Sequence, residues 1–317
     1  MSVSTETTLS SDNYQVWTVA DEPSLDERPG YYGQRRPLID FPKLGRCEIV
    51  SRVLTSSNQW QTEINDIFEI LLDHCDILLT SGCSLHVHVS PSGGSYTIEH
   101  LRNIIKGVIY YDRALTAIMP AERKDNQWAE SNVKAIKTWG DAVNLVPQNT
   151  WAPLFDTFDK QKMIPNLMLG ICGNRYVGWN FSNVLGGCGT VEFRRPPGVR
   201  SSAEANHWIA LALGYVANAI LLQDWSAIKV TKTHPSTADL RNAITRGTQI
   251  LGPGLNNALS SMADIDEPAT RPSSAELARI NQKKKDKADK RSLFAEKVWF
   301  LKYRNFKPWG LLANLMC

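Results

Sequence analysis

The chain has 317 residues, of which 43% are hydrophobic and 21% are charged, and its formal net charge is +3. These values are ordinary for a globular protein with a sizeable core, and they exclude a largely disordered chain. So small a net charge gives no support to binding of nucleic acid or of a membrane surface. We therefore expect neither kind of partner.

The cysteines and the N-terminal segment indicate a reduced, cytoplasmic protein. The six cysteines are scattered, with no CxxC pair and no zinc-finger spacing. The start, MSVSTETTLSSDNYQ, is polar and lacks the charged and apolar build of a secretory signal. The most apolar helical stretch, residues 208–222, is too short to span a bilayer and contains Asn218.

The residue pattern divides the chain into three parts. Residues 1–13 are a polar lead that we expect to be disordered, and residues 14–262 form one folded domain. Residues 263–317 read as a charged linker followed by a helical extension, whose run QKKKDKADKR is typical of a solvated helix face.

Strand and helix patterns are mixed within the folded domain. They predict strands over residues 14–20, 47–54, 85–89, 175–181 and 190–194, and helices over residues 59–79, 97–119, 203–223 and 237–251. The elements do not alternate regularly, and no GxGxxG turn is present. The pattern therefore favours an α+β fold with an antiparallel sheet over a doubly wound parallel one.

Two of these strands carry polar pairs on one face. Residues 82–90 read GCSLHVHVS, and because side chains alternate along a strand, His86 and His88 face together while Val87 and Val89 face a core. In residues 190–194, TVEFR, Glu192 and Arg194 share a face in the same way, and Val191 and Phe193 pack inward.

If the two strands share a sheet, they present these four polar side chains to one surface. Imidazole, carboxylate and guanidinium together suit a divalent metal that holds phosphate oxygens, with the arginine binding phosphate or a substrate carboxylate. The plainer interpretations are a partly exposed strand with satisfied histidines and a simple ion pair between Glu192 and Arg194.

These segments resemble the amidoligase family of the glutamine synthetase-like carboxylate–amine ligase superfamily. The chain shows the family's short motifs in the family's order: WTVADEPSL (17–25), CEIVS (47–51), LHVHV (85–89), PAER (120–123), RYVGWN (175–180) and TVEFR (190–194). One departure is that no G-x-E-x-E strand precedes Trp17.

The resemblance implies a fold, an activity and cofactors. The fold would be a curved antiparallel sheet, a glutamine synthetase-like half-barrel, with helices packed on its outer face, and residues 14–262 would be the catalytic domain. The activity would be ATP-dependent: ATP phosphorylates a small-molecule carboxylate, of an amino acid or peptide-like substrate, and an amine attacks the acyl phosphate to form an amide. Mg²⁺ would be the metal, and Mn²⁺ also suits a site that includes histidine.

The resemblance also implies a role for each matching residue. His86 and Glu192 would ligate one metal ion, and Glu48 would hold a second. The catalytic residues would be His88, which contacts nucleotide phosphates, Glu192, and Arg194, which neutralises charge on the transferring phosphoryl group. The remaining residues of the nucleotide or substrate pocket would be Arg123, Arg175 and Asn180.

The missing G-x-E-x-E strand keeps two alternatives open. One is a degenerate, non-catalytic family member that binds a nucleotide or a protein partner, and the other is a metal-dependent hydrolase that uses His86 and His88. A sheet without its edge strand would also expose unpaired backbone groups, which a homo-oligomer or the C-terminal segment would cover.

Overall fold

The computed structural model describes residues 15–21, 47–56, 59–75, 77, 79, 82–136, 150–172, 174–186 and 188–259. The expected lead and the charged extension lie outside these ranges. Contacts divide the chain into two compact units, Met1–Ala269 and Thr270–Cys317, and every described residue belongs to the first.

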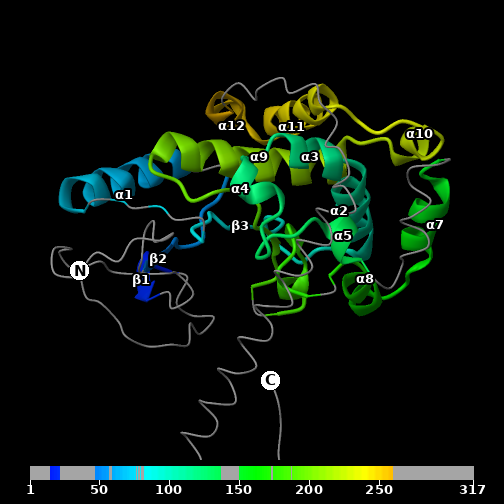
Figure 1. Ribbon diagram of the computed structural model, residues 1–317, viewed down its shortest axis with the longest axis horizontal. Helices are drawn as coiled ribbons and strands as arrows, with labels where there is room; N and C mark the ends of the chain where they lie inside the picture. Colours follow the sequence, from blue (N-terminus) through cyan, green and yellow to red (C-terminus); the bar gives the residue numbers. More distant parts are fainter. Residues whose placement is uncertain are drawn as a thin grey trace, which may run out of the picture. The chain divides into compact units, whose positions relative to one another are not determined.

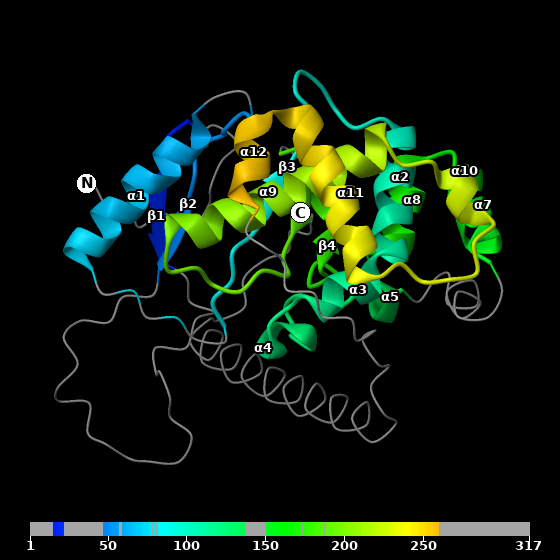
Figure 2. The same ribbon diagram turned by 90° about the horizontal axis from the view of Figure 1, so that it is seen from above.

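The central element is the long helix α9 (Ser202–Leu221), whose first turn is capped by the Ser201 side chain, which accepts from the Glu204 backbone N–H. Helices α11 and α12 lie along one side of α9, and strand β3 lies on the other (Figures 1 and 2). The packing partners of α9 are α1 (Trp60–His74), α2 (Ile98–Tyr110), α11 (Thr237–Leu251), α12 (Pro253–Ala258) and β3 (Val87–Val89). Among helices of the described residues, none is both long and apolar enough to cross a membrane.

Helices α9 and α11 cross in direct backbone contact because each has a glycine at the crossing point. A Cβ atom built on Gly247 would lie 1.8 Å from the carbonyl oxygen of Gly214, and one built on Gly214 would lie 2.6 Å from the carbonyl oxygen of Ile244. Neither obstacle is a flexible side chain. The two helices can therefore keep this separation only while both positions lack a side chain.

We expect Gly247→Ala to lower the free energy of unfolding by about 2 kcal/mol or more, because overpacking outweighs the gain in helix propensity. Chemical denaturation followed by circular dichroism measures this change. Gly94→Ala is the matched control, since a Cβ there meets nothing within 4 Å. Equal stabilities of the two variants would contradict the close helix contact.

The described strands form two separate antiparallel sheets. In the first, β1 (Thr18–Asp21) pairs with β2 (Cys47–Val50). In the second, the strand order is β3–β5–β4, where β5 is Val191–Phe193 and β4 is Trp179–Asn180.

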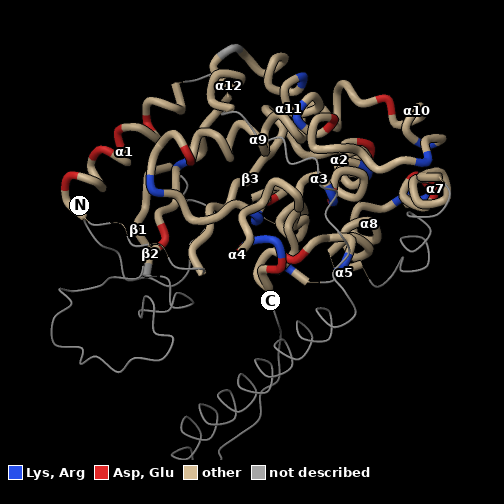
Figure 3. Tube along the Cα trace, turned by 45° about the horizontal axis from the view of Figure 1, so that its top comes forward, with Lys and Arg blue, Asp and Glu red and all other residues tan. Residues whose placement is uncertain are grey.

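A carboxylate on α1 links this helix to the residues that flank the first sheet. Glu63 accepts hydrogen bonds from Trp17 Nε1 and from the guanidinium of Arg52. Helix α1 carries four acidic residues and no lysine or arginine (Figure 3). Arg52 therefore supplies a positive charge to an otherwise acidic helix.

The apolar face of the second sheet is part of the main core. Val87 and Val89 are 7% and 5% exposed, and Val191 and Phe193 are fully buried, as the two-residue alternation predicts. Trp179 stacks between Phe193 and Tyr215, with ring centroids 4.4 Å and 4.8 Å away. The core thereby holds β4, β5 and α9 together.

The α+β class with antiparallel pairing is confirmed, whereas several predicted boundaries are wrong. The helix predicted over 97–119 is two helices, α2 and α3 (Asp112–Ala117), which separate at Tyr111. At this break the Tyr111 hydroxyl donates a hydrogen bond to Gln223, and the Tyr110 ring packs edge-on against Trp151 and Trp225. These tertiary contacts accompany the change in chain direction between α2 and α3. Of the strand predicted over 175–181, only Trp179–Asn180 is a strand.

The other predicted helices and strands are present, and each is either shorter than predicted or has the predicted bounds. Helix α1 ends at His74 because Cys75 adopts an extended backbone conformation, and α11 has the predicted bounds. The residue pattern missed the short elements α4 (Ala121–Lys124), α5 (Asn132–Ala135), α7 (Ala152–Lys160), α8 (Ile164–Ile171), η3 (Ser182–Val184), α10 (Trp225–Lys229) and α12.

A histidine is packed against the core with its ring nitrogens buried. His234 lies edge-on against Trp151 at 5.1 Å between centroids, and neither of its ring nitrogens has a hydrogen-bond partner among the described residues. Burial, reinforced by the charge of Arg113, lowers the pKa of His234 to about 4. The imidazole of His234 is therefore neutral in the folded protein at neutral pH.

Because the pKa of His234 is lower in the folded than in the unfolded state, this residue destabilises the fold as the pH falls from about 6.5 towards 4. We expect His234→Phe to keep the ring contact with Trp151 and to lose less stability than the wild type over that interval. Urea unfolding at several pH values measures the difference. Parallel pH profiles for the two proteins would show that His234 does not titrate in this way.

Candidate functional site

The pairing of β3 with β5 brings the two polar pairs together. The strands are antiparallel, with His88 directly opposite Glu192, so the condition that the two strands share a sheet is met. His86 lies one residue before β3 and on the same face as His88. The two imidazoles therefore lie beside the carboxylate of Glu192.

One carboxylate oxygen is the point on which these side chains converge. Glu192 Oε1 is 3.2 Å from His86 Nδ1 and 3.6 Å from His88 Nε2, and it accepts a short hydrogen bond from Arg194 Nη1. The other oxygen, Oε2, accepts a 2.8 Å hydrogen bond from Asn180 Nδ2, across the β4–β5 pair. We call these five residues the Glu192 cluster.

The cluster is accessible through its imidazoles. The side chain of Glu192 is 4% exposed, whereas those of His86 and His88 are 27% and 42% exposed. A buried carboxylate is tolerated only when its charge is compensated, and here a guanidinium and an amide do so. A ligand that approaches from solvent would therefore meet the imidazoles before it meets Glu192.

The protonation states follow from burial and charge. Burial lowers the pKa of His86 to about 4, and the nearby Arg194 cation acts in the same direction. Burial also lowers the pKa of His88, against the opposing charge of Glu192. Burial alone would raise the pKa of Glu192, but Arg194, the two histidines and the Asn180 hydrogen bond together hold it below its usual value. At neutral pH the cluster thus contains a carboxylate, a guanidinium and two neutral imidazoles.

Two hydroxyl groups orient the imidazoles, and sequence reasoning missed both. Ser84 Oγ is 2.9 Å from His86 Nε2, and Thr190 Oγ1 is 2.9 Å from His88 Nδ1. Because an ionised carboxylate only accepts, we assign the protons to the nitrogens that face Glu192, with the hydroxyls donating to the other nitrogens. The strand period could have found them, since each lies two residues before a cluster member.

Arg123 supports the strand backbone beneath the cluster. Its side chain donates from Nε to the carbonyl of Arg195 at 2.9 Å and from Nη2 to that of Arg194 at 2.7 Å, and the residue is 1% exposed. Burial, with the neighbouring Arg195 and Arg194 charges, lowers its pKa to about 10. In this structure Arg123 holds the end of β5 in place, and its predicted contact with nucleotide or substrate stays a prediction.

Arg195 is a buried residue that the motif search did not single out. Its Nη1 donates to Thr116 Oγ1 at 2.8 Å and lies 3.7 Å from Asp112 Oδ1. Asp112 in turn accepts from Ser131 Oγ at 2.8 Å. This group links the end of β5 to α3 and to the start of α5.

Arg175 lies over Tyr176, which with Trp128 forms a pair of aromatic rings that we call the aromatic ledge. Its guanidinium carbon is 5.1 Å above the ring of Tyr176, which packs edge-on against Trp128 at 5.0 Å. The carbonyl of Trp128 accepts from Arg194 Nε at 3.3 Å. Arg175 itself is exposed, so a ligand bound at the ledge could reach it.

Glu48 lies on β2, in the other sheet, and is exposed. The three-stranded sheet that carries the Glu192 cluster does not include β2. The assignment of Glu48 as the ligand of a second metal therefore stays a prediction.

The donor atoms of the cluster have the chemistry of a divalent-cation site. Two neutral imidazoles and a carboxylate are common ligands of Mn²⁺ and related ions, while Mg²⁺ prefers oxygen. Within the described ranges, however, no three histidine, cysteine, aspartate or glutamate side chains are grouped so as to hold a metal ion. Because Arg194 and the imidazole N–H groups face the same oxygen, these side chains must reorient before His86, His88 and Glu192 can act as ligands together.

The fold and the cluster define an α+β protein whose antiparallel sheet presents imidazole, carboxylate and guanidinium groups on one face. The chain matches the family model described as "Putative amidoligase enzyme" over residues 2–216, and it belongs to that family. The match includes every residue of the Glu192 cluster, and membership indicates ligase-type amide-bond formation. No curated protein and no solved structure matches the chain.

The assigned imidazole tautomers lead to a prediction for Thr190→Val, which removes one hydroxyl and keeps the shape of the side chain. We expect His88 to lose its single tautomer, because Nδ1 no longer accepts a hydrogen bond. Nitrogen-15 NMR of the imidazoles measures the change. Thr157→Val, which removes a hydroxyl bonded to Pro153 within α7, is the control. An unchanged His88 spectrum would contradict the assigned role of Thr190.

Proposed function

We propose that this protein is an ATP-dependent carboxylate–amine ligase that acts through an acyl phosphate. The observation that carries the proposal is the Glu192 cluster, in which two neutral imidazoles and a guanidinium surround one buried carboxylate. Phosphoryl transfer depends mainly on positioning and on compensation of negative charge. The cluster offers both on one strand face, and family membership gives the reaction class.

The chemistry divides into two transfers. A substrate carboxylate oxygen attacks the γ-phosphorus of ATP, the bond to the bridging oxygen breaks, and ADP leaves. The amine nitrogen then attacks the carbonyl carbon of the acyl phosphate, inorganic phosphate leaves, and the nitrogen loses a proton. Arg194 compensates the charge on the transferring group, and His88, the more exposed imidazole, contacts phosphate oxygens.

His86, His88 and Glu192 are the residues that would hold a divalent cation, Mg²⁺ or Mn²⁺. Such an ion supplies further compensation of phosphate charge. Without a bound ion, the guanidinium of Arg194 compensates the negative charge of Glu192. The imidazoles of His86 and His88 stay neutral at neutral pH because their pKa values are lowered. Arg175 and Asn180 complete the proposal: Arg175 contacts nucleotide or substrate from the aromatic ledge, and Asn180 orients Glu192.

Several finer properties belong to the same proposal. We infer that the β1–β2 pair and the three-stranded sheet are parts of the curved half-barrel that the family resemblance implies, which would bring Glu48 towards the site. The substrates are a small carboxylate and a small amine, without a nucleic-acid or membrane partner. The protein acts in the cytoplasm, and a homo-oligomer covers the open sheet edge.

A second candidate function is a non-catalytic family member that binds a nucleotide or a protein partner. It is favoured by the observation that both oxygens of Glu192 are already engaged, Oε1 by Arg194 and Oε2 by Asn180. A cluster satisfied in this way is stable without a metal ion. The ligase candidate converts ATP to ADP with an acid substrate, whereas the non-catalytic candidate does not.

Hydroxylamine tests the ligase proposal directly, because it traps an acyl phosphate as a hydroxamate that ferric chloride reveals. We expect the full chain, incubated with ATP, Mn²⁺ or Mg²⁺, hydroxylamine and a panel of carboxylic acids, to form hydroxamate and ADP in equal amounts. His86→Asn should lower the rate at least about tenfold. His74→Asn, at an exposed histidine on α1, should leave the rate unchanged.

Binding of ATP without release of ADP for any acid in the panel would favour the non-catalytic candidate. Equal rates for the wild type and His86→Asn would show that the Glu192 cluster does not take part in the reaction.

A further inference from the structure

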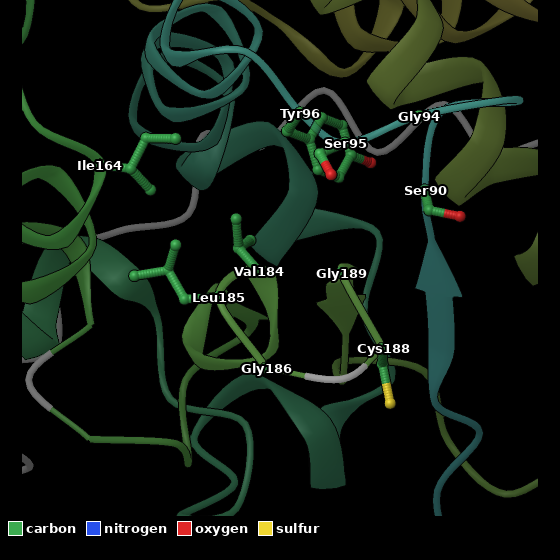
Figure 4. A pocket seen from close by; sticks show the side chains of 10 residues that line it. All are labelled: Ser90, Gly94, Ser95, Tyr96, Ile164, Val184, Leu185, Gly186, Cys188 and Gly189. Carbon is green, nitrogen blue, oxygen red and sulfur yellow. The ribbon is translucent and has the colours of Figure 1, made fainter. Parts of the chain in front are cut away.

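A cavity of about 480 Å³ opens beside the Glu192 cluster. It is lined by three segments: the end of β3 with the following turn, the first residue of α8, and the loop before β5 (Figure 4). Its size is sufficient for a small organic group. The proposed roles assign none of its residues.

The cavity adjoins one end of the β3–β5 pair that carries His88 and Glu192. Ser90 directly follows β3 and lies two residues beyond His88. Gly189, in the segment that leads into β5, precedes Thr190, whose hydroxyl contacts His88. Two residues along a strand correspond to about 7 Å, so one small molecule can reach both the cluster and the cavity.

The cavity differs from the cluster in its chemistry. None of the ten residues that line it is charged. Ile164, Val184 and Leu185 contribute apolar side chains, and Tyr96 contributes its ring, since its hydroxyl is engaged with the carbonyl of Val89 at 2.8 Å. Polar and apolar atoms form about equal parts of the cavity surface, and the polar ones are uncharged.

We propose that this cavity receives the uncharged side group of the acid substrate while the carboxylate of that substrate faces the Glu192 cluster. The inference rests on the proposed function and adds the substrate class: a monocarboxylic acid with a neutral tail. A second carboxylate on the tail is rejected, because the described residues of the lining offer no cation to compensate it and an uncompensated charge is costly to desolvate.

Hexanoate and adipate form a matched pair of probes, since they have the same chain length and differ by a terminal carboxylate. In the hydroxamate assay we expect kcat/KM for hexanoate to exceed that for adipate by about tenfold or more. Leu185→Arg adds a cation at the half-exposed rim of the cavity and should reverse the preference. Leu185→Met is the control and should retain it. The same preference in wild type and Leu185→Arg would overturn the proposal.

Cys188 gives a test that does not depend on turnover, because it is an exposed cysteine in the cavity lining. We expect hexanoate, but not adipate, to slow alkylation of Cys188 by iodoacetamide, measured by peptide mass spectrometry. Alkylation of Cys75, which is exposed at the end of α1, should not change. Protection of Cys188 by ATP alone would overturn the proposal, because the cavity would then be a nucleotide subsite. Protection by hexanoate without any ADP release would support the cavity assignment and contradict the ligase function.

Discussion

The structure of the site depends on the burial of a single carboxylate. Glu192 lies in the central strand of its sheet with 4% of its side chain exposed, and an ion in that position is stable only if its charge is compensated. Arg194 supplies the opposite charge from the same strand, Asn180 supplies a hydrogen bond from β4, and His86 and His88 approach from the β3 side. Each of the three strands thus contributes to holding one oxygen pair in place.

The opposite face of the same strands provides the rigidity that this arrangement needs. Val87, Val89, Val191 and Phe193 are buried in the main core, where Trp179 and Tyr215 connect the sheet to α9. Behind the end of β5, Arg123 donates to the carbonyls of Arg194 and Arg195, and the Arg195 side chain donates to Thr116 of α3. A polar site supported by a packed core keeps its side chains in place with little loss of entropy on binding.

The sequence could predict the parts of this arrangement that follow from local periodicity. The two-residue period placed His86 with His88 and Glu192 with Arg194, whereas the pairing of those two strands was only a condition of the sequence analysis, which the structure meets. Contacts between distant segments could not be inferred in this way. The role of Arg123 under β5, the break of the long helix at Tyr111 and the contact of Gly214 with Gly247 depend on tertiary packing, which no local pattern encodes.

The most direct test of this account is a double-mutant cycle for Glu192 and Arg194, measured as free energies of unfolding. If Arg194 compensates the buried carboxylate, Glu192→Gln and Arg194→Met should each be destabilising. The double variant should then be more stable than the sum of the two losses predicts, by about 2 kcal/mol. Losses that add to within about 0.5 kcal/mol would contradict the account, because they would show that the two side chains do not depend on each other.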